Sequence, residues 1–313
     1  TLEGNNSKFL SARQSDDAVI YNSSSGLYTL NGGSGNDTFN ANGSELTNSV
    51  IKADDGADTV SAARVTQSTI SGGLNNDVLT LSGMVSNALI NGNQSTDTIN
   101  LNGGASSSFI FGGIDSDQIN LSTSLDAVTV RANEGDDSLT IAAGTALVGS
   151  TINGNQGADS ITVNATGTST GSTIFGGTEN DTINGGGSTS VINLSGDDGD
   201  DVATGGTSTD TIDGGNGADN ITGGNGADSM TGGSGDDIFV YTGTADVVAG
   251  ETFNGGTTLE TIGDTLQITT GNTDFTNLTT ATIRTAGDIE NVLINDGIQA
   301  SFVGSQVTGQ AIN

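Results

Sequence analysis

The chain has 313 residues, of which only 32% are hydrophobic, and its 37 acidic residues against 6 basic ones give a net charge of −31. So acidic a surface repels phosphate backbones and anionic lipid, which argues against nucleic-acid and membrane-surface binding. The absence of cysteine and histidine excludes thiolate metal sites, a Ser-His-Asp triad and an imidazole base. Low hydrophobicity with high net charge is also typical of disordered chains, so regularity along the sequence has to decide between order and disorder.

The sequence opens at Thr1 without a signal-like segment. Residues 1–9 are therefore interpreted as an N-terminal edge or as the continuation of a longer chain. No apolar run approaches the roughly 18 residues of a membrane-spanning helix, so a membrane span is not expected.

Between residues 10 and 240 a turn pattern that ends in aspartate recurs. Loose matches to GGxGxD are spaced by 19–22 residues as far as Asp201, and by nine residues from there to the last one. The aspartates of these turns are Asp17, Asp37, Asp58, Asp77, Asp97, Asp117, Asp137, Asp159, Asp181, Asp201, Asp210, Asp219, Asp228 and Asp237.

Two apolar columns keep the same register as the aspartates. The residue two positions after each aspartate is large and apolar in every turn except at Ala203, and a second apolar column lies seven positions before. A disordered polar tract has no reason to keep such a register. The alternation in segments such as DVLTLS and DSITVN predicts short strands. The second turn position is Gly, Asn or Asp in all turns but one, where Arg13 stands, and these residues tolerate a left-handed backbone.

The spacing predicts an all-β parallel solenoid with 18–22 residues per coil and one strand on each side. Two nine-residue half-turns make one coil, so the longer intervals are whole coils with one aspartate turn and one plain turn. Twelve aspartates then stack along one edge, and only Asp210 and Asp228 fall on the opposite edge. Stacked carboxylates about 4.8 Å apart repel each other unless a cation lies between them, and carboxylate and carbonyl oxygens are the ligands of Ca²⁺.

The segments GGNGADNIT, GGNGADSMT and GGSGDDIFV resemble the nonapeptide repeats GGxGxDxUx of the RTX (repeats-in-toxin) family of secreted bacterial proteins. The match is strong over residues 203–240 and degenerate, but in register, over 10–202. The resemblance implies a right-handed parallel β-roll that folds when several Ca²⁺ ions bind between successive turns. It implies as ligands the side chains of Asp37, Asp58, Asp77, Asp97, Asp117, Asp137, Asp159, Asp181, Asp201, Asp210, Asp219, Asp228 and Asp237, with the carbonyls of Gly215, Gly217, Gly224, Gly226, Gly233 and Gly235.

The turns differ in quality. The pairs Asp201/Asp219, Asp219/Asp237 and Asp210/Asp228 have the most complete glycines, so these sites are expected to be the best. Ser95 and Ser208 replace the fourth-position glycine of two other turns, whose sites are expected to be poor. Two further turns begin with Ala53 and Ala132, each preceded by a basic residue, Lys52 or Arg131.

Residues 241–313 lose the nine-residue spacing. The segment FNGGTTLETIGDTLQI echoes it once, with Glu260 at the aspartate position. The pieces LTTATI, GDIENVLI and ASFVGSQVTG resemble β-rich segments that follow repeats in large bacterial adhesins and surface-layer proteins. This region is interpreted as a β-rich cap, since an open solenoid end must be covered to avoid edge pairing, or as a partner-binding segment.

These features favour a secreted, calcium-binding structural or adhesive cell-surface protein, such as an S-layer, filament or adhesin segment, and not an enzyme. The expected partners are further copies of the chain in a filament or lattice, and a cell-surface glycan or protein. The alternative is the calcium-binding module of a secreted lipase- or protease-type enzyme whose catalytic domain is absent from this chain. A lyase built on the solenoid would need a basic residue, but Arg64, Arg131 and Arg284 lie in no recognisable constellation.

Overall fold

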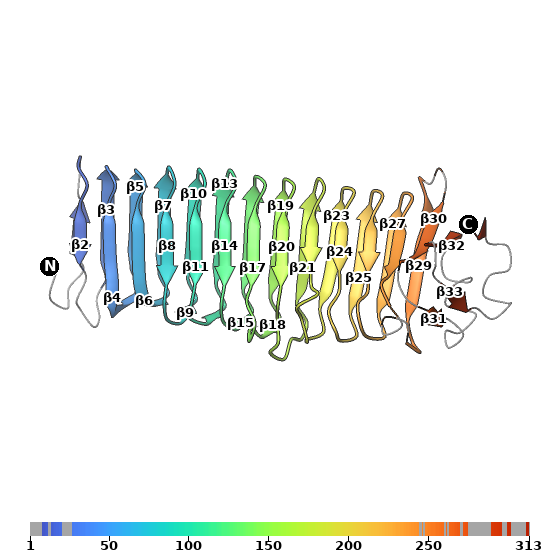
Figure 1. Cartoon of the computed structure of the whole chain (residues 1–313). Helices are drawn as coiled ribbons and strands as arrows, with labels where there is room; N and C mark the ends of the chain where they lie inside the picture. Colours follow the sequence, from blue (N-terminus) through green and yellow to red (C-terminus); the bar gives the residue numbers. More distant parts are fainter. Residues whose placement is uncertain are drawn as a thin grey trace. The chain divides into compact units, whose positions relative to one another are not determined.

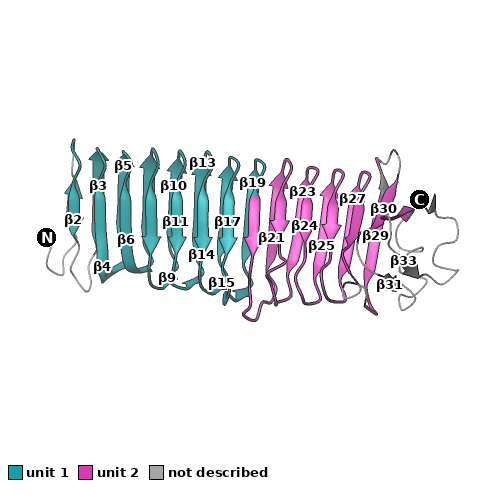
Figure 2. Cartoon of the chain, viewed as in Figure 1, with its two compact units in different colours: residues 1–159 teal, residues 160–313 magenta. Residues whose placement is uncertain are grey.

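The computed structural model describes residues 8–11, 14–20, 27–243, 246, 248–259, 261, 263–269, 272–274, 289–295, 299–301 and 311–312. The chain divides into two compact units, Thr1–Asp159 and Ser160–Asn313 (Figure 2). Most of residues 1–9 and much of 241–313 lie outside the described residues. The expectations for a terminal edge and a cap therefore remain predictions.

Unit 1 is built from strands that alternate between two parallel sheets, and they can be followed in Figure 1. The first sheet has the order β1 (Lys8–Ser11), β3 (Tyr28–Ser34), β5 (Val50–Asp55), β7 (Thr69–Leu74), β10 (Leu89–Gln94), β13 (Phe109–Ile114), β16 (Thr129–Glu134) and β19 (Thr151–Gln156). The second sheet contains β2 (Ala18–Ile20), β4 (Thr38–Thr47), β6 (Thr59–Thr66), β8 (Val78–Leu81), β11 (Thr98–Leu101), β14 (Gln118–Leu121) and β17 (Ser138–Ile141). Four two-residue strands accompany it, namely β9 (Val85–Ser86), β12 (Ala105–Ser106), β15 (Leu125–Asp126) and β18 (Leu147–Val148).

Unit 2 repeats this arrangement. Its first sheet contains β21 (Thr173–Thr178), β23 (Asn193–Asp198), β25 (Thr211–Asn216), β27 (Ser229–Ser234) and β29 (Thr252–Thr258). Its second sheet contains β20 (Ser160–Val163), β22 (Thr182–Asn184), β24 (Val202–Thr204), β26 (Asn220–Thr222), β28 (Ile238–Tyr241), β30 (Asp264–Ile268), β32 (Ile289–Ile294) and β34 (Ala311–Ile312). A separate parallel pair joins β31 (Asn272–Asp274) to β33 (Gln299–Ser301).

The two apolar columns form the core of each unit. Ile90 pairs in register with Ile70 and Ile110 on the first sheet, and Ile99 pairs with Leu79 and Ile119 on the second. All of them are fully buried. Because the side chains of a strand alternate between its two faces, the residues on either side of each of these point outward. The predicted all-β parallel solenoid is confirmed in both units.

The tight turns depend on two left-handed positions. The second turn position has a positive φ at Gly33, Asn93 and Asn133, with values of 98°, 88° and 87°. The fourth position does too, for example at Gly56 with 139°, and Ser95 adopts 76° there in spite of its side chain. The sequence pattern anticipated the second position, and the left-handed fourth position explains why glycine is so frequent there. The described part of the chain contains no helix long and apolar enough to cross a membrane.

Candidate metal centre

The aspartates of the repeat stand at the ends of the turns that lead from the first sheet to the second. In unit 1 they are Asp17, Asp37, Asp58, Asp77, Asp97, Asp117, Asp137 and Asp159, and in unit 2 they are Asp181, Asp201, Asp219 and Asp237. We call this side of each unit the aspartate edge. Asp210 and Asp228 stand on the opposite edge of unit 2, because they follow strands of the second sheet, β24 and β26. The predicted stacking of the aspartates is thus confirmed within each unit.

One carboxylate oxygen of each aspartate is held by the neighbouring coil. In unit 1 the backbone N–H of Asp77 donates to Asp97 Oδ1 at 2.7 Å and that of Asp97 donates to Asp117 Oδ1 at 2.7 Å. Donor–acceptor distances of 2.6–2.8 Å continue this ladder from Asp17 to Asp159. Unit 2 has a ladder of the same kind, with donor–acceptor distances of 2.7–2.9 Å from Asp181 to Asp237. These bonds fix the direction in which the other carboxylate oxygen points.

That second oxygen is buried and is not satisfied by the protein. Oδ2 has no hydrogen-bond partner in Asp37, Asp58, Asp77, Asp97, Asp117, Asp137, Asp201, Asp219 and Asp228, and each of these residues is at most 3% exposed. A buried, unpartnered carboxylate oxygen is costly, because it has lost its water and gained nothing in exchange. A repeated set of such atoms indicates a ligand for them.

Backbone carbonyl oxygens face the same spaces. A Cβ built on Gly214 would collide with Asp219 Oδ2 and would lie 2.6 Å from the carbonyl oxygen of Gly232 in the next coil. The same holds at Gly112, where the atoms are Asp117 Oδ2 and, at 2.7 Å, the carbonyl oxygen of Ala132. The first glycine of the turn therefore leaves open a cradle between a carboxylate and a carbonyl. We use the word cradle for this space in every turn that begins with glycine; Ala53 and Ala132 place a methyl group at this position in two other turns.

Further carbonyls point from one turn to the next. The carbonyl oxygens of Gly215 and Gly217 face Gly233 and Gly235 so closely that a side chain could not fit between them. On the opposite edge, Gly224 and Gly226 receive the carbonyls of Gly206 and Ser208 in the same way. All six glycines predicted as ligands thus lie where carbonyl oxygens line the interval between turns.

Burial shifts the titration of these carboxyls. It raises the pKa of Asp77 and Asp117 to about 8 and that of Asp97 and Asp137 to about 7, against the opposing effect of the N–H donor. In unit 2 burial raises the pKa of Asp219 to about 7. Repulsion by neighbouring aspartates also raises the pKa of Asp77, Asp117 and Asp219, by less than burial does. Burial therefore favours the protonated form of these carboxyls in the folded, metal-free chain, and a cation bound in place of the protons would likewise offset the cost of burying their charge.

The donor set fits calcium. The ligands that the cradles offer are carboxylate and carbonyl oxygens, and the sequence has no histidine or cysteine that could add nitrogen or sulfur. Hard cations such as Ca²⁺ take six to eight oxygens of these two kinds. Among the described residues no three acidic side chains converge on one point, so carbonyls must supply part of each shell. A bound Ca²⁺ would neutralise the buried carboxylates and tie successive coils together.

On the opposite edge of unit 1, buried serines accept similar bonds from a neighbouring coil at some of the turns, without charge. The N–H of Ala88 donates to Ser108 Oγ at 3.1 Å, and the N–H of Ser49 donates to Ser68 Oγ at 2.9 Å. These serines are buried. In the sequence these turns look like plain turns, because serine is common in turns of every kind. We call this side of unit 1 the serine edge.

After residue 240 the structure differs from the sequence-based expectation. The N–H of Asp237 donates to Asp264 Oδ1 at 2.8 Å, so Asp264 continues the column where Glu260 was expected. Glu260 itself lies outside the described residues. The 27-residue interval and the register shift between β27 and β29 explain why the periodicity did not find Asp264.

Glu251 is a second acidic residue that sequence reasoning missed. It is buried, its Oε2 accepts from the N–H of Asp228 at 3.4 Å, and burial raises its pKa to about 8. It therefore extends the column of Asp210 and Asp228, whose own ladder bond measures 2.8 Å. Asp210 Oδ2 accepts from the N–H of Gly206 at 2.7 Å, so this oxygen, unlike Asp228 Oδ2, already has a partner within the protein.

Comparison with known proteins follows this geometry. The RTX calcium-binding nonapeptide repeat (4 copies) matches residues 29–44, 166–189, 193–221, 204–239 and 213–248. These parts of a parallel β-solenoid therefore match the RTX repeat. The matches in unit 2 cover the turns of the three predicted best sites, and the match at 29–44 covers the turn of Asp37, so RTX repeats occur in both units.

Comparison with curated proteins and with solved structures does not identify a function for the chain. No curated protein matches the chain. Among solved structures it is similar to a hyperactive, Ca²⁺-dependent, β-helical antifreeze protein from an Antarctic bacterium, with 17% identity, a TM-score of 0.46, and coverage of 95% of this chain and 81% of that one.

Gly214→Ala should weaken calcium binding without unfolding the acidified chain. The new methyl group would enter the cradle of Asp219, and overpacking costs about 1–3 kcal/mol, which corresponds to roughly 5- to 150-fold in a dissociation constant. Ala53 and Ala132 show that the backbone accepts alanine at this position. Calcium titration followed by calorimetry measures the effect. Gly243→Ala is the matched control, because its Cβ would meet nothing within 4 Å, and equal titrations for the two variants would contradict the cradle.

Ser108→Ala should destabilise unit 1 in a manner that calcium does not rescue. The substitution leaves the buried N–H of Ala88 without an acceptor, at a cost of about 1–3 kcal/mol. Urea unfolding at saturating calcium measures the loss. The exposed serine Ser122 provides the control, since Ser122→Ala removes the same hydroxyl where water replaces it. A loss that disappears as calcium rises would show that the serine edge also depends on the ion.

Proposed function

We propose that this chain is a secreted, calcium-binding structural or adhesive cell-surface protein whose solenoid folds as several Ca²⁺ ions enter the cradles. The observation that carries the proposal is the repetition of one arrangement, a buried Oδ2 facing a carbonyl of the next coil, along the aspartate edge of both units. The RTX repeats support calcium as the ion. Millimolar calcium, which is found outside cells, suits sites of this kind.

A scaffold accounts for these carboxylates better than catalysis does. An acid–base site needs neighbouring groups whose pKa values are pushed apart in one place. Here the shifted carboxyls occupy equivalent positions in successive turns, and burial raises the pKa of each in the same direction. Such equivalence is what a repeated structural element requires, so the proposal assigns these residues to folding and not to a reaction.

Self-association follows from the same architecture. Neighbouring strands of the first sheet pair in parallel and in direct register over several coils of each unit, and the last strand of any such sheet presents unpaired N–H and C=O groups to a further copy. We propose that calcium-loaded copies assemble into a filament or lattice. The calcium dependence would then control assembly through folding.

Electron microscopy of the chain with millimolar calcium, with chelator and with magnesium tests this proposal. Ordered filaments or lattices should appear with calcium alone, because Mg²⁺ keeps its water and demands a stricter octahedral shell. Dispersed single molecules under all three conditions would contradict the structural role. Calcium-induced folding measured on the same samples would show whether the ion still binds.

A further inference from the structure

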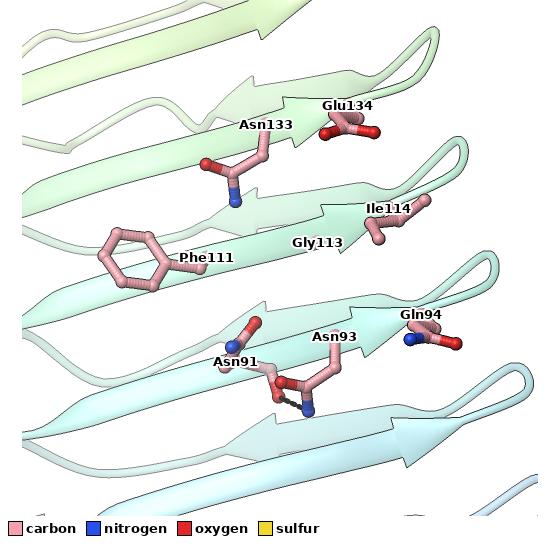
Figure 3. A pocket seen from close by; sticks show the side chains of 8 residues that line it. All are labelled: Asn91, Asn93, Gln94, Phe111, Gly113, Ile114, Asn133 and Glu134. Atoms are coloured by element: carbon pink, nitrogen blue, oxygen red, sulfur yellow. Dashed lines mark hydrogen bonds between the residues drawn. The ribbon is translucent and has the colours of Figure 1, made fainter.

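The outward face of the first sheet in unit 1 has a hollow that the calcium-binding edge does not use. It has a volume of about 430 Å³ and is lined by side chains of β10, β13 and β16, which Figure 3 shows from close by. A second hollow of about 270 Å³ adjoins it over β16 and β19 and shares Asn133 and Glu134 with it. Together they form a short trough across four neighbouring strands.

Gly113 creates the first hollow. It pairs in register with Asn93 on one side and Asn133 on the other, so a row of amide side chains is interrupted at one rung. Its φ of 142° and the carbonyl of Asn93 behind it leave no room for a side chain. In Figure 3 the amides of Asn93 and Asn133 stand on either side of this gap.

The strand β13 is apolar on the face that should be polar. Phe109 is 52% exposed and Ile114 is 43% exposed, and the half-buried Phe111 lies between them. The rings of Phe109 and Phe111 have centroids 6.1 Å apart and are tilted by 43°. The register partners of Phe111 are Asn91 and Arg131. An exposed apolar strip between polar rows, in a chain with 4% aromatic residues, marks a surface that binds something.

The pattern matches one class of ligand. A pyranose ring has C–H faces that pack on aromatic and aliphatic side chains, and a rim of hydroxyls that both donate and accept hydrogen bonds. The trough offers Phe111 and Ile114 in the middle of the first hollow, with the amides of Asn93, Gln94 and Asn133 around them. Each amide carries both donors and an acceptor. The Nδ2 of Asn93 already donates to Ser71 Oγ at 2.7 Å and to the carbonyl oxygen of Asn91 at 3.5 Å, so Asn93 offers its Oδ1 as an acceptor, and the amides of Gln94 and Asn133 can meet hydroxyls in either orientation.

The second hollow extends the same chemistry. Arg131, Glu134, Asn155 and Gln156 line it together with Asn133. Opposite charges and amides side by side bind neighbouring hydroxyls, while the acidic chain as a whole repels polyanions. Neighbouring strands lie about 4.8 Å apart, a spacing close to the repeat of sugar rings in an extended glycan. We infer that the trough over β10, β13, β16 and β19 binds a neutral oligosaccharide segment, with one sugar ring on Phe111 and the next over the second hollow.

The test uses the full calcium-loaded chain and a panel of neutral cello-, xylo-, manno- and chito-oligosaccharides, with oligogalacturonate as an anionic comparison. Calorimetry should find binding of at least one neutral series. Phe111→Thr should weaken that binding at least tenfold, because threonine keeps the strand but removes the ring. Asn133→Gly should weaken it to a similar extent, and the positive φ of this position suits glycine.

Two matched variants act as controls. Phe175→Thr removes an outward phenylalanine at the corresponding strand position in unit 2, and Asn75→Gly replaces a left-handed asparagine that lines neither hollow. Both should bind like the unmodified chain. Circular dichroism in calcium confirms the fold of each variant, and if Phe111→Thr does not fold, Asn133→Gly decides.

A direct reporter is available because the chain has no tryptophan. Phe111→Trp should keep a stacking ring in the trough and change its emission when the neutral oligosaccharide binds. Absence of binding to every neutral series, preference for the anionic sugar, or equal affinity in the trough variants and their controls would overturn the inference.

Discussion

At pH 5 and without calcium the chain should show the β-rich circular dichroism that at pH 8 it reaches only with calcium. The folded-state pKa values of Asp77, Asp97, Asp117 and Asp137 lie at about 7 to 8, against 3.8 for an aspartate in an unfolded chain. Between these values the folded state binds more protons than the unfolded state. Stability of the metal-free solenoid is therefore fully present at low pH and is lost as pH rises from about 4 to about 8.

Calcium and protons should compete for the same oxygens. The calcium-free chain, titrated from pH 5 to pH 8, should lose its β signal, and calcium added at pH 8 should restore it. The apparent calcium affinity should fall as pH decreases through 7, because the ion must displace protons from the cradles. A metal-free chain that keeps its β signal at pH 8 and low salt would contradict this expectation, and so would a calcium affinity that does not change between pH 6 and pH 8.

Replacing Asp77, Asp97, Asp117 and Asp137 together by asparagine should make unit 1 fold without calcium at pH 8. The amide oxygen keeps the ladder bond that Oδ1 accepts from the preceding coil. The amide nitrogen takes the place of Oδ2 and faces a carbonyl of the next coil, such as that of Gly92 beside Asp77. Four buried charges are removed, and at Asp77, Asp97 and Asp117 the new amide donor lies beside a carbonyl oxygen of the next coil, so the largest destabilising term of the metal-free state disappears.

The control for this variant also removes four negative charges, but from the surface. Asp55, Asp115, Asp126 and Asp136 are exposed in unit 1, and their replacement by asparagine should leave the calcium requirement in place. Hydrogen exchange at pH 8 in chelator should show protection over residues 69–141 in the ladder variant and not in the surface variant. Equal protection in both variants would mean that total charge, and not the buried ladder, prevents metal-free folding. Calorimetry should also find fewer calcium ions bound by the ladder variant.

The repeat is the reason that so much could be predicted from the sequence. Because every coil obeys one spacing rule, the positions of Ile99 and Asp97 in one coil predict the equivalent positions in the other coils. The strands, the core columns and the aspartate edge could be predicted in this way. Features that break this spacing rule could not be predicted from the sequence. Glu251 and Asp264 lie after irregular insertions, so no interval pointed to them. Ser108 takes part in a ladder that only the pairing of neighbouring coils reveals.

The trough could not be predicted for a different reason. Its lining comes from four strands whose outward residues have no common pattern, and each strand taken alone reads as an ordinary polar or mixed face. Gly113 resembles the other second-position glycines in the sequence. Only the direct register with Asn93 and Asn133 makes its missing side chain a hollow.

The central claim is that calcium lies between successive turns of the aspartate edge, and an anomalous difference map from crystals grown in calcium tests it most directly. Peaks should recur along the aspartate edge in both units, each about 2.3–2.6 Å from an aspartate Oδ2 and from turn carbonyls, and the serine edge of unit 1 should have none. A map without peaks on the aspartate edge, or with equal peaks along the serine edge, would contradict the account.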